Sequence, residues 1–483
     1  MASINKSSLR EEFDALKREL ERQCAAGKLA PETRTLIQAL LALFELLVAV
    51  FMEKRTPKNS RNSSLPPSRN DKDDETAAQP GTHTKGKAEH KGRSANTRTV
   101  ETLEIAPLYD CECCGKDLTA EPCQGHERRT LLDILYEKRE HHLDAEIKQC
   151  PECLRINKGA FPASLAGPLQ YGPGIKATVI NFLVAQMVSL KRVQQLMGTL
   201  IGQLISQASL LKFVLQLHHV LAAWEQQAIE QLLAQLSVHV DETSLWVDRK
   251  KHWIHVYSAG EITLKFLHRN RGHEAVNAIN IIPRYGGVLI HDCLAGYFSF
   301  LCCGHAVCGA HLLRELIFVV ETNGYAWAAN MKRLLKQTRK AVADSPTKCL
   351  SEKEYNNLQK RYRNILTRGA KELPPIPPRQ NGKRGRIAKS DAHNLWERLK
   401  LREQAVLLFA KLPHVAFTNN RAERDLRMSK VKQKVSGCFR TLIYAEAYCR
   451  ISSYLQTMAN RGYGPLVAIQ MALSGEIYAQ TGE

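Results

Sequence analysis

The chain of 483 residues is long enough to hold several domains, and its hydrophobic fraction of 44% is ordinary for a globular protein. Lysine and arginine outnumber aspartate and glutamate by 68 to 48, and the formal net charge of +20 favours an anionic partner. The 14 cysteines, many of them in short-spaced pairs, are typical of metal ligands and buried thiols in a reducing compartment. Since the segment MASINKSSLREEF has no signal-peptide pattern, we expect a cytoplasmic protein.

Residues 1–54 are predicted to be helical. In the first helix, 7–28, apolar residues recur at intervals of four, three and four, as in a coiled-coil seam of about two heptads: Leu9, Phe13, Leu16 and Leu20. The second helix, roughly 32–54, contains ALLALFELLVAVFM, which includes Glu45 and is short for a membrane span. The two helices form either an oligomerisation element or a hairpin packed on its own chain.

Residues 55–100 contain almost no apolar side chains and are rich in Pro, Ser, Asn, Gly and mixed charge. Because such a composition cannot bury a core, we predict a disordered basic linker. Its Lys and Arg residues at 85–98 either contact DNA non-specifically or stay solvated.

The segment 101–156 contains two CxxC pairs, which are Cys111 with Cys114 and Cys150 with Cys153. A tetrahedral Zn²⁺ takes four such ligands from two turns, so we predict a zinc-binding domain in which the metal has a structural role. The alternative is a set of free buried thiols. The stretch TLLDILYEKREHHLDAEIKQ between the pairs is strand-like and is predicted to form a hairpin that returns the chain to the site. Rival ligands are Cys113, Cys123 and His126.

Residues 165–232 are predicted to be helical, because apolar residues in 172–225 recur about every 3.6 residues. The last of these helices is poor in the basic and amide side chains that read DNA bases, with Lys212 and Gln216 isolated. A helical bundle that braces the next domain is at least as compatible with this composition as a base-reading helix.

Residues 236–300 contain four strand-like runs rich in aliphatic, β-branched and aromatic side chains. Asp241 ends the apolar run of the first strand, and Asp292 ends that of the fourth. A carboxylate at the end of a buried strand is costly unless something pairs with it. Two such carboxylates therefore indicate a shared cation.

In 413–455, the run FTNNRAERDLRMSKVKQKV predicts a helix that begins near Arg421 and is capped by an asparagine at 419 or 420. Glu423 lies in its first turn, and Arg427 and Lys430 follow on the same face. A third carboxylate beside a stripe of cations suits a site that holds metal and DNA phosphate together.

The spacing of the three acids predicts a helical insertion. Asp292 follows Asp241 by 51 positions, whereas Glu423 follows Asp292 by 131, so residues 301–412 are predicted to be a helical insertion. Residues 456–483 are predicted to form C-terminal helices. The loop PPIPPRQNGKRGRIAKS in the insertion either lies along DNA phosphates or is a mobile surface loop.

Four motifs, in order along the chain, carry a family resemblance. VDET with Asp241, HDCLAGYF with Asp292, CGHAVCGAHLLREL, and NNRAERDLRMSKVKQKVSGCFR with Glu423 resemble the insertion sequence 66 family of bacterial transposases. The resemblance implies a DDE transposase whose catalytic triad is Asp241, Asp292 and Glu423. The expected fold is a multidomain α/β fold. It has an RNase H-like catalytic core, in parts 236–300 and 413–455, with the large helical insertion between them.

The resemblance also implies a leucine-zipper-like segment within 1–54 and a helix-turn-helix-like region within 165–232. Three carboxylates can hold two Mg²⁺ ions, or Mn²⁺, about 4 Å apart and clamp the attacking and leaving oxygens of an in-line displacement. Implied partners are double-stranded DNA at the element ends and target, a second copy of the chain and, in many members, small accessory proteins. The predicted DNA contacts are Arg427, Lys430, Lys432 and Lys434.

Cys308 and His311 resemble a CxxH motif that follows the second aspartate in many DDE transposases. A second zinc site is one interpretation, with further ligands nearby. A buried packing role is favoured, because these residues fall on one predicted helix or its entry. The nearby ligand candidates are Cys302, Cys303 and His305.

Three positions differ from the sequence pattern usual in the family, but none of them is a predicted metal ligand: Ser244, Cys293 and Thr418. Two alternatives to the transposase share its residues. One is a catalytically inactive relative that binds DNA as a regulator, and the other is a metal-dependent nuclease that hydrolyses DNA without strand transfer.

Overall fold

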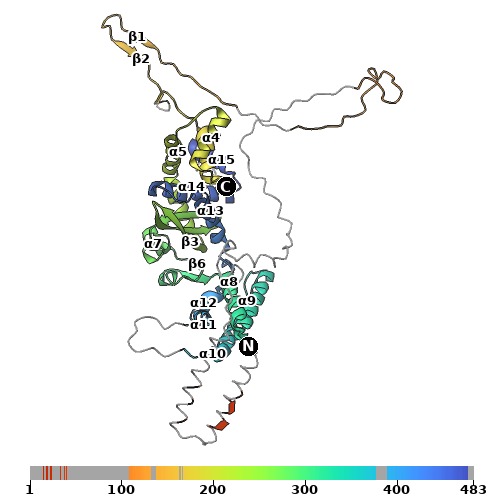
Figure 1. The fold of residues 1–483 in the computed structure, drawn as a ribbon, viewed down its shortest axis with the longest axis vertical. Helices are drawn as coiled ribbons and strands as arrows, with labels where there is room; N and C mark the ends of the chain where they lie inside the picture. Colours follow the sequence, from red (N-terminus) through yellow and green to blue (C-terminus); the bar gives the residue numbers. More distant parts are fainter. Residues whose placement is uncertain are drawn as a thin grey trace, which may run out of the picture. The chain divides into compact units, whose positions relative to one another are not determined.

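The computed structural model of the chain describes residues 108–131, 137–162, 165, 167–376 and 389–476, with a few single positions between 15 and 62. The predicted oligomerisation helices, the basic linker, residues 377–388 of the proline-rich loop and the end of the chain after 476 lie outside the described residues, those single positions apart. Figure 1 labels the helices and strands along the chain, and contacts divide the chain into two units. One comprises Met1–Lys87, Ala228–Leu245 and Lys251–Lys430, and the other Ala88–Gln227, Trp246–Lys250 and Val431–Glu483.

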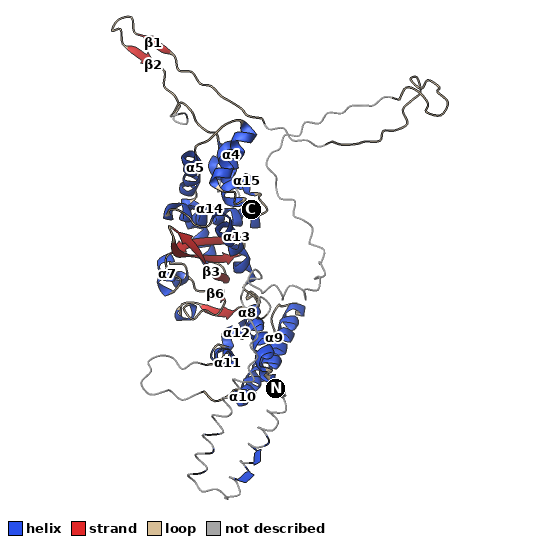
Figure 2. Ribbon diagram, viewed as in Figure 1, coloured by secondary structure: helices blue, strands red, loops and turns tan. Residues whose placement is uncertain are grey.

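The first unit is built on a five-stranded mixed sheet, whose strands are red in Figure 2. The strands are β3 (Ser237–Val247), β4 (Lys250–Ala259), β5 (Ile262–His268), β6 (Val288–His291) and β7 (Gly304–Val307). Their order is β5-β4-β3-β6-β7. The β4–β5 pair is antiparallel, whereas β3–β6 and β6–β7 are parallel. The predicted α/β class is confirmed.

Burial along the strands follows from their sequences. Val238, Val240 and Leu245 of β3 are buried, as expected for apolar side chains on a strand that packs on a core. The short β6 is buried along its whole length, as strands in the parallel part of an α/β sheet usually are. Helix α7 (His273–Ile279) and a short 3₁₀ turn, Ile282–Arg284, connect β5 to β6.

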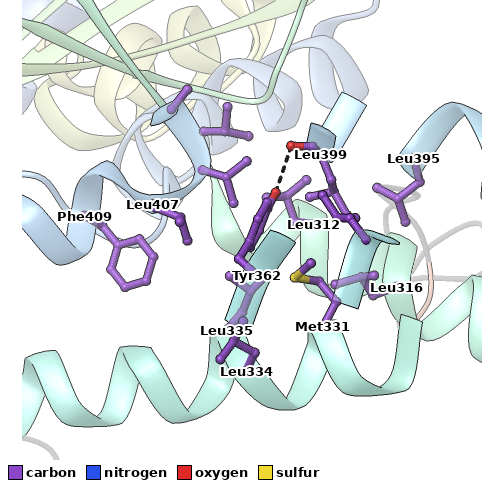
Figure 3. Packing of buried hydrophobic residues seen from close by; sticks show 14 of the residues in the cluster. Leu312, Leu316, Met331, Leu334, Leu335, Tyr362, Leu395, Leu399, Leu407 and Phe409 are labelled. Atoms are coloured by element: carbon purple, nitrogen blue, oxygen red, sulfur yellow. Dashed lines mark hydrogen bonds between the residues drawn. The ribbon is translucent and has the colours of Figure 1, made fainter. Parts of the chain in front are cut away.

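Five helices follow β7 and form a second part of the first unit. They are α8 (Gly309–Asn323), α9 (Ala326–Asp344), α10 (Glu352–Glu372), α11 (Asp391–Leu401) and α12 (Glu403–Lys411). Their apolar faces share one core with β6 and β7. Tyr362 lies within this core, and its hydroxyl donates a hydrogen bond of 2.9 Å to the main-chain carbonyl of Leu399 (Figure 3).

The second unit contains a small hairpin and a group of helices. In the hairpin, β1 (Ile147–Gln149) and β2 (Ile156–Lys158) pair antiparallel. The helices are α3 (Pro173–Ile180), α4 (Leu190–Ile201), α5 (Gln207–Val220), α14 (Leu442–Asn460) and α15 (Pro465–Ser474). Helix α6 (Ala222–Leu233) continues from the second unit into the first. Within the second unit, a half-buried Arg450 pairs with the buried Glu225 at 2.7 Å.

Two local features differ from the sequence-based expectation. Residues 304–307 fall inside the predicted insertion but form β7, so the helices begin only at α8. The hairpin between the CxxC pairs was expected within TLLDILYEKREHHLDAEIKQ, whereas β1 takes only its end and β2 follows Cys153. Among the described residues, no helix combines the length and apolar character needed to span a membrane.

Replacing Tyr362 by Phe is expected to destabilise the helical core by about 1–2 kcal/mol, because the buried Leu399 carbonyl loses its hydrogen-bond donor. The half-buried Tyr355 of α10 provides a matched control, and Tyr355→Phe should change stability by less than about 0.5 kcal/mol. Urea unfolding of both variants measures the difference. Equal midpoints for the two variants would contradict the role given to the Tyr362 hydroxyl.

Candidate active site

The sheet brings Asp241 and Asp292 together. Asp241 lies in β3, and Asp292 directly follows β6, which pairs with β3 in parallel. The register pairs His239 with Ile290, and continuing it by two residues places Asp241 opposite Asp292. Neighbouring strands lie about 4.8 Å apart, so the two aspartates are adjacent at the point where β6 ends.

Electrostatics connect the third predicted carboxylate to this pair. Burial and, after it, the neighbouring carboxylates of Glu242, Asp292 and Glu423 raise the pKa of Asp241 to about 8. The backbone N–H of Glu242 donates to Asp241 Oδ1 at 2.9 Å, and this bond lowers the pKa of Asp241. Nearby negative charges disfavour the ionised form of a carboxyl group. Asp292 and Glu423 therefore both lie within electrostatic reach of Asp241, although the three carboxylates do not form a group of ligand atoms within 4.8 Å among the described residues.

Helix α13 (Asn420–Ser436) carries Glu423 in its first turn and is anchored by Asp425. The buried carboxylate of Asp425 accepts hydrogen bonds from Ser258 of β4 at 2.7 Å and from Thr263 of β5 at 2.9 Å. These bonds attach the start of α13 to the β4–β5 hairpin. The residues that α13 buries recur at helical spacing, as expected for one packed face: Ala422, Asp425, Leu426 and Ser429.

Asn419, immediately before α13, connects the first strand to the helix that carries Glu423. Its side chain is fully buried, and Nδ2 donates to the main-chain carbonyl of Val240 at 2.7 Å. Its Oδ1 lies 3.1 Å from Nδ1 of His239, whose pKa is lowered to about 4 by burial, so we assign the imidazole as neutral with Nδ1 as donor. The backbone N–H of Asn419 donates to Cys308 Sγ at 3.1 Å. Sequence reasoning identified Asn419 only as a helix cap.

The Glu423 carboxylate also faces α8. Its Oε1 lies 3.5 Å from Nδ1 of His311, and its Oε2 lies 4.0 Å from Nη2 of Arg314. One ligand atom each from Cys308, His311 and Glu423 lies within 4.8 Å of the other two. The first turn of α8 therefore belongs to the site. The predicted ligand candidates Cys302, Cys303 and His305 do not join this group.

Glu242 is a fourth carboxylate that the sequence analysis did not select. It is buried, and it accepts hydrogen bonds of 2.7 Å from Arg271 Nε and from the Tyr297 hydroxyl. Burial and then Asp292 raise its pKa, whereas Arg271 and Tyr297 lower it. Its position next to Asp241 in VDET, and that of Tyr297 in HDCLAGYF, are the signals that sequence reasoning had available.

The predicted DNA-binding cations differ in their exposure. Arg427 and Lys430 are exposed and follow Glu423 by four and seven positions, so they continue its side of α13. Lys434 is also exposed. Lys432 is half-buried, its ammonium donates to the main-chain carbonyl of Leu183 at 3.2 Å, and burial lowers its pKa. Lys432 is therefore the least accessible of the four.

The two CxxC pairs form turns with the same hydrogen bonds. In each turn the N–H of the first cysteine, Cys111 or Cys150, donates at 2.9 Å to a carbonyl five residues later, and its carbonyl accepts the N–H four residues later. Backbone N–H groups of the turn lower the pKa of both thiols, which favours the thiolates that bind metal. In the part of the chain that the structure describes, no three of the four predicted zinc ligands gather in one group. The zinc site therefore stays a prediction.

A model of the Transposase IS66 family matches residues 168–447, more than half of the chain and all three predicted carboxylates. The chain belongs to this family. The recognition made from the four motifs is thereby confirmed, and a transposase role with DNA as partner follows from membership. A comparison with curated proteins found no match.

Replacing Asn419 by Ala is expected to destabilise this transposase by about 2–4 kcal/mol, because a buried carbonyl and the His239 donor both lose a partner. The exposed Asn420 is a control next in the chain, and Asn420→Ala should stay within about 0.5 kcal/mol. Denaturant unfolding measures both. Equal destabilisation by the two variants would mean that the Asn419 hydrogen bonds do not contribute the expected free energy of unfolding.

Replacing Asp241 by Asn is expected to stabilise the protein in EDTA, increasingly as the pH rises. The pKa of Asp241 is about 8 in the folded protein and ordinarily 3.8. Its ionisation therefore lowers the free energy of unfolding as the pH rises between those values. Asp241→Asn should therefore be neutral at pH 4 and stabilise by about 1–3 kcal/mol at pH 8. Thermal unfolding across this range measures the effect, with the exposed Asp344→Asn as control. A gain that does not depend on pH would contradict the expectation.

Proposed function

We propose that this transposase cuts and joins DNA strands at the ends of a bacterial insertion sequence, with Asp241, Asp292 and Glu423 as its catalytic residues. The observation that carries the proposal is the parallel register of β3 with β6, which sets the two aspartates side by side. Asn419 and Asp425 then hold the helix that supplies the glutamate.

The sheet supports an RNase H-like core as the catalytic domain. Its first three strands are neighbours in the order β5-β4-β3, and β6 and β7 follow in parallel on the other side of β3. The acids lie on the central strand β3, directly after its neighbour β6, and on the helix that follows the insertion. This arrangement suits a catalytic domain divided into the two parts expected from the sequence.

The residues fit divalent metal ions of the Mg²⁺ class. Asp241, Asp292 and Glu423 offer the carboxylate oxygens that Mg²⁺ prefers, and Glu423 Oε1 is buried without a hydrogen-bond partner. Burial first, and then the charges of Glu242, Asp292 and Glu423, raise the pKa of Asp241, and a bound cation would offset both effects. When bound there, such ions would activate the attacking oxygen and stabilise the leaving one.

The expected reaction is a pair of phosphoryl transfers. Water attacks a phosphodiester at the element end, the bond from phosphorus to the 3′ oxygen breaks, and a 3′-hydroxyl is released. That hydroxyl then attacks a phosphodiester of the target strand, displaces its 3′ oxygen and joins the two DNAs. Both steps depend mainly on positioning and charge stabilisation.

Several residues of the chain contribute to this positioning. Asn419 fixes the spacing between the strand with Asp241 and the helix with Glu423. Arg427 and Lys430 are exposed on the Glu423 side of α13 and suit contacts to DNA phosphates. Structural zinc in the 101–156 segment and oligomerisation through residues 1–54 complete the proposal. The two CxxC turns, which have the same hydrogen bonds, support the zinc site, and the predicted coiled-coil seam supports oligomerisation.

A strand-transfer assay with Mg²⁺ and an element-end oligonucleotide tests the proposed function. Each of Asp241→Asn, Asp292→Asn and Glu423→Gln should reduce cleavage and joining at least about 100-fold, because each removes charge that the transition state requires. Glu352→Gln, in the exposed first turn of α10, is a control for the loss of a carboxylate.

The outcomes separate the alternatives. DNA binding without cleavage by the wild-type chain would support the regulator, and cleavage without joining would support the nuclease. Full activity in any one of the three variants would reject the assignment of that residue.

A further inference from the structure

Cys308, His311 and Glu423 form a compact group beside the catalytic carboxylates. Cys308 immediately precedes α8, and His311 follows three residues later in its first turn, so both face the same side. Gly309 allows a close approach of α8 to the segment before α13. Its N–H donates to the Phe417 carbonyl at 2.8 Å, and a Cβ there would lie 2.3 Å from the Phe417 ring. The geometry of the group is therefore set by backbone contacts.

The separations within the group suit a tetrahedral ion. For metal–ligand bonds of about 2.0–2.3 Å, the edges of a tetrahedron measure roughly 3.3–3.8 Å. The distance of 3.5 Å between His311 Nδ1 and Glu423 Oε1 lies within this interval. The three ligand atoms all lie within 4.8 Å of one another, so small side-chain rotations complete the arrangement.

Two of the three ligand atoms have no hydrogen-bond partner among the described residues. His311 Nδ1 and Glu423 Oε1 are buried, and neither has a hydrogen-bond partner. Most buried polar atoms in proteins form hydrogen bonds, so two neighbouring atoms without one are unusual. Cys308 Sγ accepts the backbone N–H of Asn419, which lowers the pKa of this thiol, whereas burial, the larger effect, raises it.

The donor set selects a different class of ion from Mg²⁺. Sulfur, imidazole nitrogen and one carboxylate oxygen are typical ligands of Zn²⁺ and Co²⁺, whereas Mg²⁺ takes oxygen ligands. Three protein ligands leave a fourth position for water or a ligand.

We propose that Cys308, His311 and Glu423 bind a transition-metal ion such as Zn²⁺, and that this ion competes with the catalytic divalent ions for Glu423. The competition rests on the proposed function, whereas binding of the ion does not. Both oxygens of Glu423 lie within 4.0 Å of α8 side chains, so the carboxylate is already turned toward this second site. Occupancy of the site would hold Glu423 there and inhibit DNA cleavage.

Titration of the full-length chain with Co²⁺ tests the binding. A thiolate ligand gives a charge-transfer band in the near ultraviolet, and the CxxC cysteines contribute a background that is the same in all variants. Cys308→Ser and His311→Asn should each remove one bound Co²⁺ from the stoichiometry or weaken its affinity at least about tenfold. Cys349→Ser, between α9 and α10, is the matched control and should behave as wild type.

Identical spectra, stoichiometry and affinity in all four proteins would overturn the proposal and leave Cys308 and His311 as packing residues. Should Cys308→Ser unfold, as reported by its thermal transition, His311→Asn decides the question. Cobalt binding is measured without DNA, so it remains decisive even where the wild-type chain shows no cleavage.

Zn²⁺ added at a fixed Mg²⁺ concentration tests the competition. It should inhibit cleavage by the wild-type chain, and more Mg²⁺ should relieve the inhibition. In Cys308→Ser the Zn²⁺ concentration for half inhibition, relative to that protein's own rate, should rise at least about tenfold. A wild-type rate that is insensitive to Zn²⁺, with cobalt bound as expected, would overturn the competition.

Discussion

Negatively charged side chains that repel one another have to be held together by contacts elsewhere in the structure. In this transposase burial first, and then repulsion from neighbouring carboxylates, raise the pKa of Asp241. The opposing contacts are the β3–β6 register, the Asn419 bond to Val240 and the Asp425 bonds to β4 and β5. None of them touches the carboxylate that it helps to place. Holding these carboxylates close together is therefore unfavourable in itself, and contacts elsewhere in the fold keep them in place.

The contrast between Asp241 and Glu242 shows which acids are available to a cation. Glu242 is compensated by Arg271 and Tyr297, each at 2.7 Å. Asp241 accepts the backbone N–H of Glu242, and the charges of three neighbouring carboxylates act on it. The partners of Glu242 partly offset the cost of burying its charge, whereas a buried acid with few such partners is a candidate for chemistry. We therefore interpret Glu242 as support for the site and Asp241 as part of it.

Sequence reasoning succeeded where the signal is local. The apolar runs before Asp241 and Asp292 predicted two buried strands, and the structure has β3 and β6 there. It missed β7, because four residues that include glycine and histidine show no strand periodicity. It also missed the function of Asn419, whose partner Val240 lies 179 positions away. Local patterns describe Asn419 as a cap, and only the fold makes it a link between two distant segments.

The CxxC pairs show the same division between local and distant information. Their spacing predicted zinc ligands from two turns, and the two turns have the same hydrogen bonds and a lowered pKa of their first thiol. Convergence of four ligands depends on contacts between segments, which spacing alone does not specify.

Helix α8 explains why the helical insertion is attached where it is. Its buried side, with Leu312, Leu316 and Val319, belongs to the core that includes Tyr362 and Trp327. Its other side presents His311 and Arg314 to Glu423. Helix α8 follows β7 directly, so its first turn, which faces the glutamate, lies between the sheet and the core of the insertion. The insertion thus packs on the sheet and also supplies two side chains to the proposed site.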